Sequence, residues 1–173
     1  MHGLNETVRA EVRSAVHGAS GRGEVRAAVH ALYQHLQDAI ELRGPVCESS
    51  GRCCRFDEYG HRLFVSTMEL ATFIHDLGAG PGCDESHGHG CPFQSGKLCT
   101  VHAFRPFGCR VFYCDPTART WQEEQYERFH TRLRRLHDEL KVPYFYLEWR
   151  EGLAALGLTF PAGNTPVGVP ELL

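Results

Sequence analysis

The chain has 173 residues, which is enough for one domain with a modest hydrophobic core. Hydrophobic residues make up 42% and charged residues 23%, as in ordinary soluble proteins, and the formal net charge is −3. That charge argues against a phosphate-binding surface, so we expect no nucleic-acid partner. No run approaches the roughly 18–20 apolar residues of a membrane span, and the first residues show no apolar signal-sequence core. We therefore expect a cytoplasmic protein without membrane contact.

The first 44 residues predict two helices. Asn5 is a suitable cap for the first, in which valines recur every four residues. We expect the glycine-rich run Gly18–Gly23 to interrupt it. Apolar residues at helical spacing then predict a second helix from about Glu24 to Leu42, which Gly44-Pro45 should end.

The middle of the chain has fewer regular signals. A short strand is expected at His61–Val65, and Ser66–Glu69 forms a capping box that begins a helix ending at Gly78. Residues 78–90 are rich in Gly, His, Asp and Ser and predict a loop. From Cys91 to Cys114 we expect the bound ligand to determine the fold more than local propensity does.

The last part predicts a long, highly charged helix from Thr117 to about Lys141, stopped by Pro143. Its expected buried stripe is Trp121, Tyr126, Phe129, Leu133, Leu136 and Leu140. Residues 144–147 predict a brief strand or extended link, and 148–156 a short helix. The expected fold is a single, mainly α domain with an irregular, metal-organised cysteine-rich centre, with a small α+β fold as the alternative. Its expected parts are a helical segment (1–44), a cysteine-cluster metal-binding domain (45–116), helices packing on it (117–158) and a tail (159–173).

All eight cysteines lie in the middle of the chain, between Cys47 and Cys114. Thiols stay reduced in the cytoplasm, and thiolates suit zinc, copper(I) and iron–sulfur clusters. Buried free cysteines, or disulfides in an exported protein, are the less favoured alternatives. The sequence therefore predicts metal binding by a common set of thiolates: Cys47, Cys53, Cys54, Cys83, Cys91, Cys99, Cys109 and Cys114.

Two cysteine-containing stretches carry a family resemblance. They are Cys47-Glu-Ser-Ser50-Gly-Arg-Cys53-Cys54-Arg55 and the segment 91–114, with its Cys-Pro-Phe and Arg105-Pro-Phe-Gly-Cys109-Arg110. Together they resemble the CxxCxxCC cysteine-cluster family (YkgJ-like), described as zinc- or iron-chelating. Ser50 stands where the family has its second cysteine. Cys83 could replace that ligand, Ser50 could ligate weakly through oxygen, or the site could need only some of the cysteines; the first and third interpretations are favoured.

The spacing of the cysteines bears on which metal they bind. Tetrahedral zinc usually takes CxxC-type pairs, and none occurs here. Adjacent side chains such as Cys53 and Cys54 tend to diverge, which suits a cluster with several irons better than one ion. The sequence therefore favours an iron–sulfur cluster, above all a four-iron one, and leaves zinc open.

Several residues near the cysteines are candidates for supporting or completing the metal site. Arg105 and Arg110 flank Cys109 and could donate hydrogen bonds to the bound centre, or form ordinary structural ion pairs. Among the loop histidines His87, His89 and His102, the last is best placed to complete a metal site, because it lies between Cys99 and Cys109. Most such histidines are merely solvated.

Three functions are consistent with these residues. The first is a redox or electron-transfer role for an iron–sulfur protein. The second is a structural zinc module that binds a protein partner. The third rests on a resemblance of the cysteine motif to flagellin lysine N-methylases, which implies a cluster-dependent methyl transfer. No Walker loop, GxGxxG, HExxH or GxSxG is present, so the sequence names no catalytic residue and leaves enzyme activity undecided.

Overall fold

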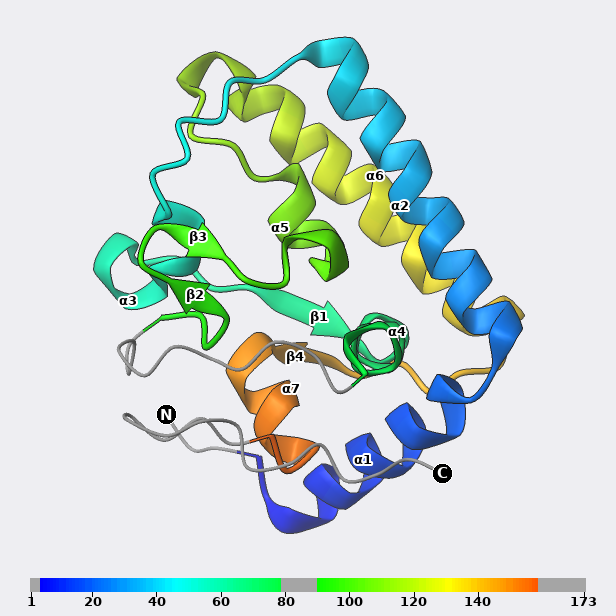
Figure 1. Cartoon of the computed structure of the whole chain (residues 1–173). Helices are drawn as coiled ribbons and strands as arrows, with labels where there is room; N and C mark the ends of the chain where they lie inside the picture. The colour runs from blue at the N-terminus through cyan, green and yellow to red at the C-terminus, as the bar shows by residue number, and fades with distance from the viewer. Residues whose placement is uncertain (1–3, 79–89, 159–173) are drawn as a thin grey trace.

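A computed structural model describes residues 4–78 and 90–158, and this part of the chain is mainly helical (Figure 1). The principal helices are α1 (Glu6–Ser20), α2 (Gly23–Arg43), α4 (Thr67–Leu77), α6 (Arg119–Glu139) and α7 (Trp149–Ala155). Shorter elements lie between them: η1 (Arg52–Cys54), α3 (Phe56–Tyr59), β1 (Phe64–Ser66), β2 (Gln94–Ser95), β3 (Leu98–Cys99), η2 (His102–Phe104), α5 (Phe107–Val111), η3 (Pro116–Ala118) and β4 (Tyr146–Glu148). The predicted mainly α fold with a small β part is confirmed.

The two predicted N-terminal helices are present. The Asn5 side chain caps α1 by accepting a hydrogen bond of 2.9 Å from the Val8 amide. The predicted interruption within Gly18–Gly23 is confirmed: it falls at Gly21 and Arg22, which separate α1 from α2, and Gly18 still lies inside α1. A single glycine weakens a helix without ending it. Gly44 ends α2 in the left-handed conformation, with φ of 61°, as Gly44-Pro45 predicted.

Helix α4 lies at the centre of the molecule, where Figure 1 shows it end-on between α1 and α2. The predicted capping box is confirmed, with Ser66 and Glu69 exchanging hydrogen bonds. The strand before it covers Phe64–Ser66, later than the expected His61–Val65. Its partner β4 pairs antiparallel with it, with Val65 opposite Leu147, so the ladder extends toward Ser66 rather than back to His61.

Helix α6 lies alongside α2 (Figure 1). Phe129 and Leu133 of the predicted stripe are buried, and so is His137, which the apolar pattern did not include. The other stripe residues are half-buried. The helix ends at Glu139, before the expected Lys141 and well before Pro143, and β4 and α7 follow as predicted.

Some expectations concern residues outside the described part of the chain. These are the Cys83 ligand, His87, His89 and the tail at 159–173. Across residues 4–78 and 90–158, none of the helices combines the length and the apolar character that crossing a bilayer requires.

Candidate functional site

Seven of the cysteines line a single cavity of about 340 Å³. They come from separate places in the chain: the link after α2, η1, the segment before β2, β3, α5 and the segment before η3. The seven are Cys47, Cys53, Cys54, Cys91, Cys99, Cys109 and Cys114, all of them free thiols. The fold thus brings together residues that lie far apart in the sequence.

Cys54 is the centre of the thiol contacts. Its buried side chain forms hydrogen bonds with the thiols of Cys53, Cys91 and Cys99. These bonds raise the pKa of Cys54 and lower the pKa of Cys53 to about 6 and that of Cys99 to about 7. Two thiols therefore ionise near neutral pH, and the thiolate is the form that binds metal.

Cys109 lies against the same group from α5. Burial raises its pKa well above the ordinary value, and the negative charges of Cys91, Cys99 and Cys53 raise it further. We call Cys53, Cys54, Cys91, Cys99 and Cys109 the inner thiols. Their mutual interactions make them one electrostatic unit, in which ionising one thiol hinders ionising the next unless a cation compensates.

Cys47 and Cys114 lie at the edge of this unit. Cys47 is exposed, and the Sγ of Cys114 lies 3.3 Å from the hydroxyl oxygen of Ser50. The structure therefore places this serine beside a thiol and at the cavity wall.

Among the residues that the structure describes, no carboxylate lines this cavity. Its charged side chains are Lys97 and Arg105, although the whole chain has a net charge of −3. The Arg105 guanidinium contributes to lowering the pKa of Cys53 and of Cys99. The positive charge of this wall thus favours thiolates.

The two arginines predicted to support the metal site, Arg105 and Arg110, have different positions. Arg105 lines the cavity, and its guanidinium donates hydrogen bonds to the carbonyls of His102 (3.1 Å) and Cys109 (3.4 Å). Arg110 is not among the cavity-lining residues. It donates to the Arg105 and Ala103 carbonyls, both at 2.6 Å, and its guanidinium lies 4.4 Å from the ring centre of Tyr33. Arg110 thus fixes the turn that presents Arg105, while His102 reaches the cavity wall itself.

A close backbone contact joins the two cysteine-containing stretches. The Cys91 amide donates a hydrogen bond of 2.7 Å to the Cys54 carbonyl. A Cβ atom at Gly90 would lie 2.6 Å from that carbonyl oxygen, so only glycine permits the approach. Gly51 has a similar role with φ of 71°, because a Cβ there would lie 2.9 Å from the Lys97 carbonyl.

Replacing Gly90 with alanine should push these stretches apart and destabilise the protein by roughly 1–3 kcal/mol, the usual cost of overpacking. Gly18→Ala is the matched control, because a Cβ there meets nothing within 4 Å and lies inside a helix. It should stabilise by up to about 1 kcal/mol. Denaturant unfolding followed by circular dichroism measures both. Equal stability of the two variants would contradict the role given to Gly90.

Glu69 connects the centre of the fold to the cysteine-bearing helix α5. Its side chain is 1% exposed and accepts hydrogen bonds from the amides of Ser66 (2.9 Å) and Phe107 (3.1 Å). The Tyr33 hydroxyl donates a longer one of 3.4 Å. Burial raises the pKa of Glu69 to about 6 despite these bonds, which favour the ionised form. The sequence identified Glu69 as a helix cap and gave no signal of its contact with α5.

The seven thiols line one cavity, and Cys54 contacts three of the others. Within residues 4–78 and 90–158, no group of three or more His, Cys, Asp or Glu side chains is arranged to hold a metal ion. Comparison with known proteins adds no constraint: no family model, no curated protein and no solved structure matches the chain. The chemistry of the cavity therefore has to be inferred from its own residues.

Proposed function

We propose that the chain is an iron–sulfur protein with a redox or electron-transfer role, and that the inner thiols hold the cluster. The observation that carries this proposal is the convergence of seven free thiols on one cavity. Cysteines kept only for packing would have no reason to gather on one cavity from so many separate segments. Thiolate sulfur is the usual protein ligand of such clusters.

The donor set fits such a cluster chemically. Cys53 and Cys99 ionise near neutral pH, and Arg105 supplies positive charge beside an anionic centre. The bound cluster would supply one-electron chemistry at this wall. The protein's part is to hold the thiolates, to place the Arg105 charge and to limit access of water, which together influence the reduction potential.

The arrangement of the thiols supports a cluster over a single zinc ion. Zinc takes four ligands around one point at about 2.0–2.3 Å. The sequence has no CxxC pair of the kind that usually supplies those ligands. A cluster with several irons distributes its ligands around a larger body, as thiols around a cavity of about 340 Å³ are distributed. The resemblance to the zinc- or iron-chelating cysteine-cluster family is consistent with either metal.

A redox titration of the protein purified without oxygen tests the proposed role. The visible absorption should bleach on reduction with dithionite and return on mild oxidation, over several cycles. A structural zinc module would instead show no redox transition and would unfold in its middle part when the metal is chelated. That result would replace the redox proposal with a partner-binding one.

A further inference from the structure

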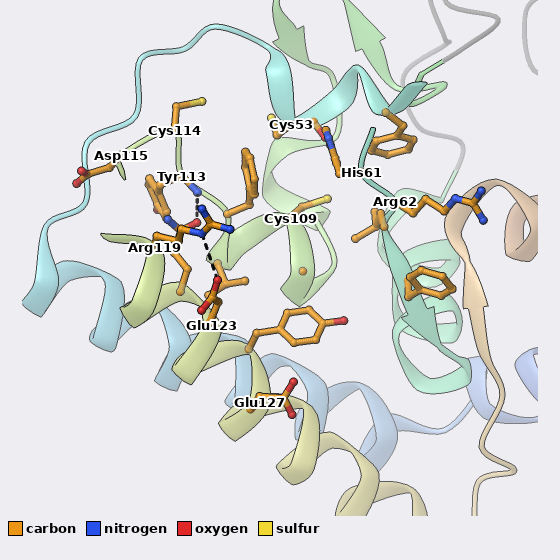
Figure 2. A pocket seen from close by; sticks show the side chains of 18 of the residues that line it. Cys53, His61, Arg62, Cys109, Tyr113, Cys114, Asp115, Arg119, Glu123 and Glu127 are labelled. Carbon is orange, nitrogen blue, oxygen red and sulfur yellow. Dashed lines mark hydrogen bonds and ion pairs between the residues drawn. The ribbon is translucent and has the colours of Figure 1, made fainter. Parts of the chain in front are cut away.

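A second cavity, of about 630 Å³, shares a wall with the cysteine cavity. Its volume lies within the range of ligand pockets. Cys53, Cys109 and Cys114 line both cavities. Figure 2 shows this second cavity between the segment that carries His61 and Arg62 and the side of α6 that carries Arg119, Glu123 and Glu127. A ligand bound here would therefore lie against the thiols from the side of α6.

Several aromatic side chains form part of the wall of this cavity. Phe64 of β1, Phe112 and Tyr113 after α5, and Tyr126 of α6 all line it. The rings of Phe112 and His61 are stacked, with centroids 5.7 Å apart and planes at 12°. Phe112 remains 41% exposed, which is unusual for a large apolar side chain and leaves its ring available at the pocket. Aromatic walls of this kind favour a flat ring by stacking.

The charged residues at the cavity are two arginines and three carboxylates. Arg119 pairs with Glu123 at 3.3 Å, and the Asp115 carboxylate accepts hydrogen bonds from the amides of Thr117 and Val46. Arg62 and Glu127 remain, both exposed and on opposite sides of the cavity in Figure 2. The five charged lining residues therefore carry a formal net charge of −1, which disfavours an anionic ligand.

Two polar groups inside the cavity could orient an uncharged ligand. One ring nitrogen of His61 is 3.3 Å from the Cys53 carbonyl, which leaves the second nitrogen for another partner. The Tyr126 hydroxyl is bonded to the Tyr146 hydroxyl and retains capacity for one more hydrogen bond. The second nitrogen of a neutral His61 ring can accept a hydrogen bond from a ring N–H. The Tyr126 hydroxyl can donate to a carbonyl oxygen on the edge of a flat ring when Tyr146 donates to it.

We propose that this second cavity binds a planar, uncharged aromatic ring bearing carbonyl oxygens, the chemistry shared by quinones and by the isoalloxazine ring of flavins. The inference goes beyond the proposed iron–sulfur function and stands without it, because stacking walls and hydrogen-bonding groups do not depend on a metal. If both hold, the ring lies beside the thiols that hold the cluster.

Binding of two uncharged probes tests the inference. Lumiflavin, titrated by the quenching of its fluorescence, represents the isoalloxazine ring. Duroquinone, measured by equilibrium dialysis and by competition with lumiflavin, represents quinones and has no ring hydrogen for a thiol to displace. We expect saturable binding of at least one probe, with one ring per chain. The tighter probe identifies the source of the ring.

Replacing Phe112 with alanine should weaken binding about tenfold, since stacking on one aromatic side chain has an effect of that order. Phe112→Leu keeps an apolar side chain without the ring and provides a second variant. The matched control is Tyr59→Ala, which removes an equally exposed aromatic ring (43%) that lines neither cavity. It should bind as the wild type does. Absence of saturable binding by both probes, or equal weakening by Phe112→Ala and Tyr59→Ala, would overturn the inference whatever the metal content.

Discussion

Replacing Glu69 with alanine should lower the free energy of unfolding by about 4 kcal/mol, because it leaves buried donors unpaired at roughly 1–3 kcal/mol each. The donors are the amides of Ser66 and Phe107 and the hydroxyl of Tyr33. The loss should loosen the start of both α4 and α5. Denaturant unfolding measures the change, and metal content of the folded fraction reports whether α5 still presents Cys109.

The matched control for this variant is Asn5→Ala, which removes an exposed helix cap at the other end of the molecule. Loss of such a cap costs about 1 kcal/mol. Glu69→Gln keeps one carbonyl oxygen but turns an NH₂ group toward one of the donors, so its stability should lie between wild type and Glu69→Ala. If Glu69→Ala costs no more than Asn5→Ala, the central role of this carboxylate is wrong.

Glu69 should also make stability depend on pH. Because burial raises its pKa from 4.5 to about 6, the folded protein binds a proton more tightly than the unfolded chain does. The contribution is therefore fully present below pH 4.5 and is lost as the pH rises through about 6, a total of about 2 kcal/mol. The stability of wild type relative to Glu69→Gln should fall by this amount over that interval. A flat or rising difference would show that the pKa is not raised.

Replacing Cys54 with serine should lower metal affinity at least tenfold, because even the loss of a group that only supports a ligand costs about 10–100-fold. Cys54 is the inner thiol in contact with three others, and a neutral hydroxyl is a poor ligand beside thiolates. Iron and sulfide per chain, measured after purification without oxygen, give the result directly.

Cys47→Ser is the control for this prediction. Cys47 lines the same cavity but is exposed and lies outside the inner thiols. Its variant should keep most of the metal. Equal losses of metal in the two variants would show that the inner thiols are not a distinct ligand group. Full retention of metal by both variants would show that these cysteines do not bind it.

The sequence predicted the features that depend on neighbouring residues. The Asn5 cap, the capping box of Ser66 and Glu69, and the end of α2 at Gly44 follow from local hydrogen bonds and backbone preferences, and all are present. The interruption expected within Gly18–Gly23 is present as well, at Gly21 and Arg22 between α1 and α2.

The site was predictable only in part, because much of it is formed by contacts between segments that are distant in the chain. The crowding of the cysteines indicated a common site, and seven of them do line one cavity. The contact of Glu69 with Phe107, the glycine at position 90 beside the Cys54 carbonyl, and the second cavity between β1 and α6 all join segments distant in the chain. No local pattern encodes such contacts.

Analysis of iron and acid-labile sulfide in the protein purified without oxygen tests the central proposal most directly. We expect a brown protein that contains iron and sulfide in equal amounts, about four of each per chain for a four-iron cluster. A colourless protein with stoichiometric zinc, or one without bound metal, would contradict the proposal.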